Sequence, residues 1–285
     1  MKVLVTGGNS YCGRYVIKAL FNTGHEVRVN VRKPPGLWMA LEHNPAHTGS
    51  IRWFSGDLND RTTYNIIAGM QFDAIVHMAA QTHPASAVDF VEENVEATKN
   101  VLDYAERAGV KKFINFSSIS VVDKPKDVYS MTKAIAEDLV NESSTPSLNL
   151  RLPAVVGPGS TRNYLSETYN LIRNDKHGLC TQPYNRTNKA IAVEDLAKFV
   201  VTLVGDPTTR KADTIQLGAN TNMSWLEIID QMYADQGKDK NRLSVSEPYT
   251  DNPTMSALNI QIAENRYGFE SRSMEETIRS MTNGV

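Results

Sequence analysis

Residues 2–16 read KVLVTGGNSYCGRYV. A short apolar run leads into Gly7-Gly8, and a helical pattern follows from Tyr11 to Asn22, where Thr23-Gly24 marks a stop. Glycine in such a turn permits a tight bend and lets backbone N–H groups approach an anion, while the helix N-terminus adds partial positive charge. An ordinary strand-to-helix turn has the same outline, but the position of these glycines between a strand and a helix favours a phosphate-binding turn.

Short apolar runs alternate with helical patterns through the first half of the chain. The runs are rich in Val, Ile or Phe, as expected for strands that are buried on both faces. They predict strands at 2–6, 26–31, 51–54, 74–77, 112–116 and 148–152, and helices at 11–22, 85–108 and 193–204. The alternation predicts a Rossmann-type α/β fold, a doubly wound parallel sheet that binds ligands beyond the carboxyl ends of its strands.

The rhythm weakens after residue 155, where Gly157, Pro158 and Gly159 interrupt it. Two later helices are predicted from capping boxes, in which Ser224 precedes Glu227 and Ser273 precedes Glu276. We expect a nucleotide-binding domain at 1–157, with 190–217 returning to it, and a smaller C-terminal substrate-binding lobe made of 158–189 and 218–285.

The chain has 285 residues and a formal net charge of -2. This balance gives no electrostatic footprint for nucleic acid or an anionic membrane surface. Two cysteines, Cys12 and Cys180, are too few for a disulfide framework or a cysteine-rich zinc site. We therefore expect a cytoplasmic protein without a bound metal, a signal peptide or a membrane span.

The glycine turn resembles the Thr-Gly-x-x-Gly-x-x-Gly fingerprint of the extended short-chain dehydrogenase/reductase family, NAD-dependent epimerase/dehydratase type, in its nucleotide-sugar-modifying branch. Thr6, Gly7 and Gly13 match, whereas Ser10 replaces the middle glycine and adds a Cβ near the diphosphate. The backbone there must hold an angle that serine accepts. The resemblance implies cofactor contacts from Gly7, Asn9, Ser10, Tyr11, Cys12 and Gly13.

Four later segments resemble the same family in the same order: GDL at 56–58, HMAA at 77–80, Asn94 with Thr98, and RLP at 151–153 followed by VGPG at 156–159. Each alone has a plainer interpretation, such as a turn aspartate or a structural histidine. Their joint order favours the family. It implies further cofactor contacts from Asp57, Leu58, Met78, Ala79, Ala80, Asn94, Pro153 and Val156.

The second predicted strand suggests which cofactor binds. NAD enzymes of the family place an acidic residue for the ribose hydroxyls where this chain has Val31. Arg32 and Lys33 follow it and are suited to a 2′-phosphate, although such a pair is also common on a solvated surface. We therefore expect NADP (NADPH) to be preferred, with NAD still possible.

The segment Tyr129-Ser130-Met131-Thr132-Lys133 places a phenol and an amine one helical turn apart. A nearby ammonium favours the phenolate, so we expect Lys133 to lower the pKa of Tyr129. The pattern alone is weak evidence, but the predicted strand before it ends at Ser118. Ser117 is the nearest alternative candidate for the catalytic serine. The family resemblance implies catalytic Ser118, Tyr129 and Lys133, with Lys133 also bonding the nicotinamide ribose.

The resemblance is least informative about the substrate. Its first implication is an NAD(P)-dependent ketoreductase of a nucleotide-activated keto-sugar, with Tyr129 as proton donor and with Gln81, Ser118, Tyr129, Arg162 and Arg186 near the substrate. A nucleotide-sugar epimerase, a reductase of a non-sugar carbonyl and a non-catalytic NADP-binding sensor remain alternatives. The segment 188–193 lacks the arginine that many members use for the sugar nucleotide's diphosphate.

Assembly is suggested by the same helix. Met131, Ile135 and Leu139 form an apolar stripe beside the Tyr129/Lys133 face. The second cover over this helix is either another helix of the same chain or a second subunit, and the family resemblance implies a homodimer.

Overall fold

The computed structural model describes residues 1–34, 49–82, 86–122, 127–175, 178–180, 187–208, 211–239, 243–245 and 258–282. The chain divides into two compact units. The first comprises Met1–Arg151 and Ala197–Ile215, and the second comprises Leu152–Leu196 and Gln216–Val285.

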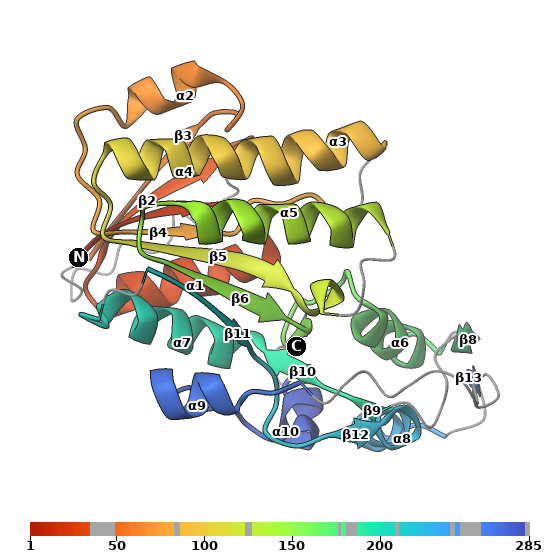
Figure 1. The fold of residues 1–285 in the computed structure, drawn as a ribbon. Coiled ribbons are helices and arrows are strands. Elements are labelled where there is room, and N and C mark those ends of the chain that lie inside the picture. The colour runs from red at the N-terminus through yellow and green to blue at the C-terminus, as the bar shows by residue number, and fades with distance from the viewer. Residues whose placement is uncertain are drawn as a thin grey trace. The chain divides into compact units, whose positions relative to one another are not determined.

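A seven-stranded sheet in the order β11-β6-β5-β4-β1-β2-β3 forms the centre of the first unit (Figure 1). Its strands are β1 Lys2–Thr6, β2 Glu26–Val31, β3 Ser50–Ser55, β4 Ala74–His77, β5 Lys112–Ser118, β6 Ser147–Leu152 and β11 Ala212–Gln216. The pairs β2·β3, β1·β2, β1·β4 and β4·β5 are parallel. The strand order reverses beside β1, which puts the end of β1 at the switch point where such sheets bind ligands. The predicted Rossmann-type fold is confirmed.

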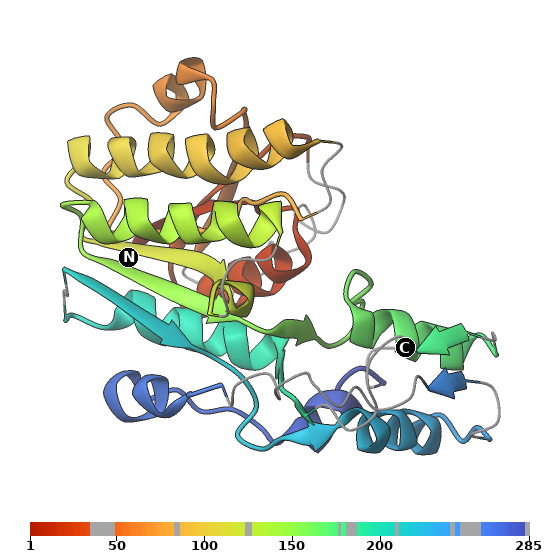
Figure 2. The same ribbon diagram turned by 45° about the vertical axis from the view of Figure 1, so that its right-hand side comes forward.

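Helices cover both faces of this sheet (Figures 1 and 2). One face carries α3 Ala87–Val91, the π-helical segment η2 Glu92–Glu96, α4 Ala97–Arg107 and α5 Val128–Glu142. The other carries α1 Tyr11–Asn22 and α7 Val193–Gly205, while α2 Arg61–Ile66 follows β3 and the short 3-10 helix η3 Ile119–Val121 follows β5. Leu4, Ile75 and Phe113 pack with Val101 and Val140 on the α4/α5 face.

The predicted helix at 85–108 differs from the structure in one respect. It is interrupted by the five π-helical residues of η2, among which Asn94 and Val95 are buried. An extra residue in a helical turn re-aims the side chains that follow it, and such segments are frequent at functional sites. The six strands predicted from sequence all form, and the helix at 11–22 has the predicted ends.

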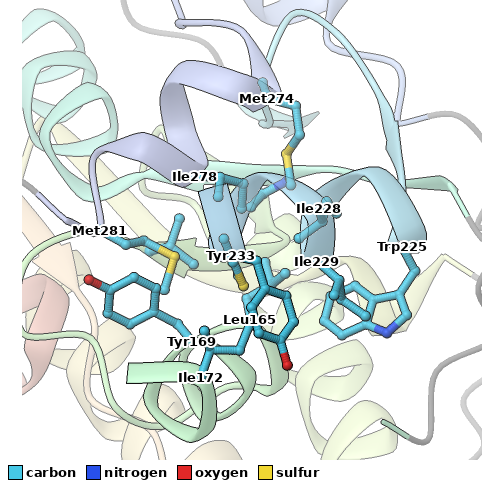
Figure 3. Close-up of a cluster of buried hydrophobic side chains, with 14 residues drawn as sticks. Leu165, Tyr169, Ile172, Trp225, Ile228, Ile229, Tyr233, Met274, Ile278 and Met281 are labelled. Carbon is cyan, nitrogen blue, oxygen red and sulfur yellow. The ribbon is translucent and has the colours of Figure 1, made fainter. Parts of the chain in front are cut away.

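The second unit is built around helices α6 Tyr164–Arg173, α8 Trp225–Asp235 and α10 Met274–Arg279, with α9 Gln261–Tyr267. Figure 3 shows apolar side chains of α6, α8 and α10 converging, with Trp225 fully buried at the end of the cluster. Its short strands pair two by two: β7 Ala154–Val156 with β10 Ala190–Ala192, β9 Thr187–Asn188 with β12 Met223–Ser224, and β8 Gly178–Cys180 with β13 Leu243–Val245. Both predicted capping boxes, at Ser224 and at Ser273, are present.

Within the described ranges, no helix has both the length and the apolar character that crossing a membrane requires.

Candidate active site

The glycine turn after β1 is packed too tightly for side chains at three of its positions. A Cβ on Gly7 would lie 2.7 Å from the Ala79 nitrogen, and one on Gly8 would lie 2.1 Å from Val29 Cγ1. A Cβ on Gly13 would lie 2.7 Å from the carbonyl oxygen of Gly7. Gly7 also has a φ of +71°, which side-chain-bearing residues rarely adopt. The turn therefore keeps its backbone open to a ligand at the N-terminus of α1, which fits a dinucleotide's diphosphate.

Ser10, which replaces the family's middle glycine, is the N-cap of α1. Its φ of -69° and ψ of 162° are ordinary extended values, so the position does not require glycine. Its Oγ accepts a hydrogen bond from the Gly13 nitrogen at 3.0 Å. The serine thus stabilises the helix start that points at the ligand. Tyr11 and Cys12 follow on α1, where burial raises the pKa of the Cys12 thiol to about 12.

The end of β2 has the basic residues expected for a 2′-phosphate, but one of them is engaged. Val31 is buried, and the Arg32 guanidinium forms an exposed ion pair with Glu93 of η2 at 2.5 Å. Asn9 Nδ2 donates to the Lys33 carbonyl oxygen at 2.9 Å, which ties the glycine turn to this segment. The structure therefore brings Asn9, Arg32 and Lys33 together beside the turn.

Asp57 and Leu58 follow β3. The Asp57 carboxylate accepts from the Asn59 nitrogen at 2.8 Å, and the Asp57 carbonyl oxygen accepts from Thr63 Oγ1 at 2.6 Å. Leu58 is buried, and its carbonyl oxygen accepts from the Tyr64 hydroxyl at 2.9 Å. These bonds fix the loop in which both residues were predicted to contact the cofactor.

A chain of buried hydrogen bonds links the ends of β1 and β4 to the start of α4. Thr6 Oγ1 lies 2.8 Å from His77 Nδ1, and His77 Nε2 lies 3.0 Å from Thr98 Oγ1. A threonine hydroxyl has one proton, and Thr98 gives its proton to the Asn94 carbonyl oxygen at 2.7 Å. Thr98 must therefore accept from Nε2–H, which leaves Nδ1 to accept from Thr6.

Thr6 also accepts from the backbone nitrogens of Met78 and Ala79, each at 3.3 Å. Every role in this chain requires a neutral imidazole. Burial, with a smaller contribution from the charge of Lys133, lowers the pKa of His77 to about 3. His77 is thus a structural residue that positions the Met78-Ala79-Ala80 segment, which lies next to Gly7.

Asn94 joins the same region to α5. Its Oδ1 accepts from the Gln81 nitrogen at 2.7 Å, and its Nδ2 donates to the Gln81 carbonyl oxygen at 3.0 Å and to Thr132 Oγ1 at 3.1 Å. Thr132 in turn donates to the carbonyl oxygen of Tyr129 at 2.8 Å. The π-helical turn thus places the buried Asn94 amide between Gln81 and the helix of Tyr129. The sequence assigned both of these segments to the site.

Ser118, Tyr129 and Lys133 meet where β5 ends and α5 begins. Ser118 lies close enough to Tyr129 to act on its pKa, and Ser118 Oγ accepts from the Ser120 hydroxyl at 2.9 Å, so the Ser118 proton remains available to another acceptor. The Tyr129 ring packs on Phe90 with ring centroids 6.0 Å apart. Lys133 is buried and donates to the Phe116 carbonyl oxygen at 2.5 Å.

The protonation of this group differs from the sequence-based expectation. Burial raises the pKa of Tyr129 above its ordinary value, and the nearby Ser118 only partly opposes that. Burial also lowers the pKa of Lys133 to about 8, with Glu137 acting in the opposite direction. The net lowering of the Tyr129 pKa that was expected from Lys133 does not occur, because desolvation dominates. Tyr129 is therefore a protonated phenol that can donate.

A family model described as the NAD dependent epimerase/dehydratase family matches residues 3–218, well over half of the chain. The chain belongs to this family. Its members include NAD-dependent enzymes of the extended short-chain dehydrogenase/reductase type, among them dehydrogenases, reductases and epimerases.

Two curated members illustrate the range. The sterol-4-alpha-carboxylate 3-dehydrogenase (decarboxylating) of Saccharomyces cerevisiae is 27% identical over 180 residues, which are 55% of this chain and 52% of that protein. The ceramide reductase of Caulobacter vibrioides is 25% identical over 231 residues, 80% of this chain and 68% of that protein. The match to the sterol enzyme thus spans about half of its length.

Solved structures of the family share the fold along the whole chain. The UDP-glucuronic acid 4-epimerase of Bacillus cereus, solved with UDP-glucuronic acid and NAD, superposes with a TM-score of 0.84. It is 19% identical, and the match covers 98% of this chain and 97% of that one. At this identity the likeness concerns the fold.

The remaining residues that sequence assigned to an epimerase/dehydratase-type site lie elsewhere in the chain. Pro153 and Val156 belong to the second unit, where Val156 is fully buried in the apolar cluster of Figure 3. Arg162 is exposed in the same unit. Arg186 lies outside the described residues.

Sequence reasoning missed Glu137 and the role of Arg151. Glu137 is buried on α5, and its carboxylate pairs with the Arg151 guanidinium at 2.6 Å and accepts from Ser117 Oγ at 2.5 Å. Ser117, the rival to Ser118 for the catalytic role, is therefore turned toward Glu137, while Ser118 lies near Tyr129 and acts on its pKa. The signal was a glutamate four residues after Lys133, among the buried residues Ala136 and Val140.

Proposed function

We propose that this protein is an NAD(P)-dependent ketoreductase in which Tyr129 protonates the substrate oxygen. The observation that carries the proposal is the grouping of Tyr129 with Ser118, which is close enough to act on its pKa, and with the buried Lys133 one helical turn away. The raised pKa of Tyr129 keeps its proton at neutral pH, which suits the direction of reduction. A bound reduced nicotinamide would supply the hydride for this reduction.

The protein's own residues would hold the reacting oxygen. Tyr129 donates its proton to that oxygen as the carbonyl becomes an alcohol, and Ser118 hydrogen-bonds the same oxygen. An ammonium has three donors, and the contact with Phe116 uses one of them on Lys133. The others suit the nicotinamide ribose. The charge of Lys133 also favours the phenolate that remains after proton transfer.

As the substrate we propose a nucleotide-activated keto-sugar, with Gln81, Ser118 and Tyr129 of the first unit beside it. The Bacillus cereus epimerase, which shares the fold, is described with UDP-glucuronic acid and NAD. A lipid-like ketone is the second candidate, because the curated relatives include a sterol dehydrogenase and a ceramide reductase.

For the cofactor we propose a preference for NADPH. β2 ends in the buried, apolar Val31, which offers ribose hydroxyls no acceptor side chain. Arg32 is 53% exposed in its pair with Glu93, and exposed pairs stabilise little, so a phosphate dianion can displace the carboxylate. Dissociation constants for NADPH and NADH test this; equal values or tighter NADH binding would contradict it.

We also propose a homodimer. α3 and α5 lie side by side (Figures 1 and 2), and together they expose Val88, Val91, Val128, Met131 and Ile135. Large apolar side chains that are exposed on two neighbouring helices are candidates for an interface. A second copy presenting the same face would bury them by twofold symmetry.

The function is tested by NADPH oxidation with a panel of 4-keto-sugar nucleotides, sterol ketones and 3-keto-sphingoid bases. Tyr129→Phe keeps the ring contact with Phe90 but removes the proton, so turnover should fall by roughly 100-fold or more. Tyr104→Phe, a change in a tyrosine that bonds the Ile67 and Met70 carbonyl oxygens outside the site, is the matched control. Unchanged turnover in Tyr129→Phe would remove the proposed mechanism, and cofactor retained through purification would favour an epimerase.

A further inference from the structure

One edge of α5 carries a row of polar side chains at four-residue spacing: Tyr129, Lys133, Glu137 and Asn141. Residues four apart lie on one face of a helix, so this row forms a continuous seam against the sheet. Tyr129 lies near Ser118 of β5. Each of the next three members forms hydrogen bonds with β5 or β6: Lys133 with Phe116, Glu137 with Ser117 and Arg151, and Asn141 with Asn149. Glu137, the third residue of this row, was assigned no role from the sequence.

Glu137 is locked from two sides. Arg151 Nε donates to Oε1 at 2.9 Å and Arg151 Nη2 donates to Oε2 at 2.6 Å, which is a bidentate pairing. Ser117 Oγ donates to Oε1 at 2.5 Å. The carboxylate side chain is 4% exposed. Breaking such a pair by losing one partner is costly, so its geometry is rigid.

The residue that Glu137 holds, Ser117, stands between two residues of the site. Phe116, on one side, offers the carbonyl oxygen that binds Lys133 Nζ. Ser118, on the other side, lies close enough to Tyr129 to act on its pKa. Glu137 therefore fixes the last residues of β5 against the same helix that carries Tyr129 and Lys133. A shift of α5 along the strand would break all of these bonds together.

We propose that Glu137, held by Arg151 and Ser117, is a positioning residue that keeps the Lys133 ammonium charged and in place beside Tyr129. The proposal rests on the proposed function for the use that is made of Lys133, and on the contacts above for the arrangement itself. Glu137 acts through Lys133 and β5, not on the substrate.

The charges around Lys133 support this role. On its own helix it lies between Tyr129 and Glu137; His77 faces it from β4, and Arg151 stands behind Glu137 on β6. Burial lowers the pKa of Lys133, and Glu137 opposes that effect. His77 is neutral, so the carboxylate of Glu137 is the group among these that favours the ammonium.

The test is an NMR titration of Lys133 in protein carrying carbon-13-labelled lysine, with the signal assigned by its loss in Lys133→Met. Glu137→Gln keeps the shape and removes the charge, so the pKa of Lys133 should fall by about one pH unit or more. Glu142→Gln, an exposed change on the same helix, should leave it unchanged. Glu137→Asp retains the charge and should restore most of the pKa.

The double variant Glu137→Gln/Arg151→Gln leaves neither charge of the pair unmatched, so it serves if the single variant does not fold. A Lys133 pKa at the wild-type value in a folded Glu137→Gln or double variant would overturn the proposal. Tyr129→Phe separates the two ideas: if that variant keeps its turnover, the proposed function fails while the titration still decides the role of Glu137.

Discussion

The two faces of α5 reverse the usual distribution of side chains. Four of its six buried residues are polar or charged, namely Ser130, Thr132, Lys133 and Glu137, whereas Val128, Met131 and Ile135 are exposed. In the second unit, α8 follows the ordinary pattern, and its buried residues are Trp225, Ile228, Ile229, Met232 and Tyr233 (Figure 3). A helix packed by apolar contact tolerates small slides, but one packed by directed hydrogen bonds has a single register. The contrast indicates that the packing of α5 fixes its register against the sheet.

The largest expected effect comes from disrupting the buried polar contacts of α5. Arg151→Gln removes the partner of the buried Glu137 carboxylate, so the free energy of unfolding should fall by about 3 kcal/mol. Lys111→Gln, which breaks an exposed pair with Asp73, should cost less than about 1 kcal/mol. Urea unfolding of both variants measures the difference. Equal losses of unfolding free energy would mean that the buried pair on α5 stabilises the protein no more than an exposed pair does.

The second effect is a pH dependence in the buried network beside α5. The folded-state pKa of His77, about 3, lies below its ordinary 6.5, so the unfolded state takes up the proton first as pH falls. Stability should therefore drop between pH 6.5 and about 3, by up to about 1.4 kcal/mol per pH unit.

His77→Gln removes this proton uptake, so its unfolding free energy should change less steeply with pH over the same interval. The comparison of slopes cancels the contribution of carboxylates common to both proteins. Parallel slopes would show that the imidazole is not buried and neutral.

The third effect concerns the exposed apolar face. Met131→Glu and Ile135→Glu should abolish the proposed dimer, while the stability of the monomer changes by no more than about 0.5 kcal/mol. Leu226→Glu, at an exposed leucine of the second unit, is the control. Sedimentation velocity compares the three with the parent chain. A parent chain that sediments as a monomer at every concentration would exclude the dimer.

The smallest effect sharpens the contrast at η2, where Asn94 is buried and Glu93 is exposed. Glu93→Gln frees Arg32, so the preference for NADPH over NADH should rise by about threefold, in line with the small energy of an exposed pair. Arg32→Gln should reduce that preference, and Glu92→Gln should leave it unchanged. Fluorescence titrations with both cofactors give the ratios. A rise in NADH affinity in Glu93→Gln would contradict the role of Arg32.

The sheet was predictable because its signals are local. Each of the six predicted strands is a short apolar run, and the caps at Ser224 and Ser273 use residues three apart. The glycine turn was equally local, including the requirement that Ser10 hold an angle open to serine, which its φ of -69° satisfies.

The rest depended on contacts between distant segments. The π-helical turn at Glu92–Glu96 accompanies bonds from Asn94 to Gln81 and Thr132, which no local pattern encodes. The pairing of Glu137 with Arg151 follows from the packing of α5 on β6, and the raised pKa of Tyr129 follows from burial. A sequence pattern identifies such side chains as candidates, but their partners and solvent exposure are fixed only by tertiary structure.

The fixed donor and acceptor roles of Thr6, His77 and Thr98 also limit which residues can replace them in this fold. The first pair is 71 positions apart and the second is 21 apart, yet the three share one pattern of donors and acceptors. Serine at either end would preserve it, whereas valine, of nearly identical shape, would strand an imidazole nitrogen. Homologues that lose one threonine to an apolar residue should therefore have replaced the histidine as well, so the three positions should vary as a set.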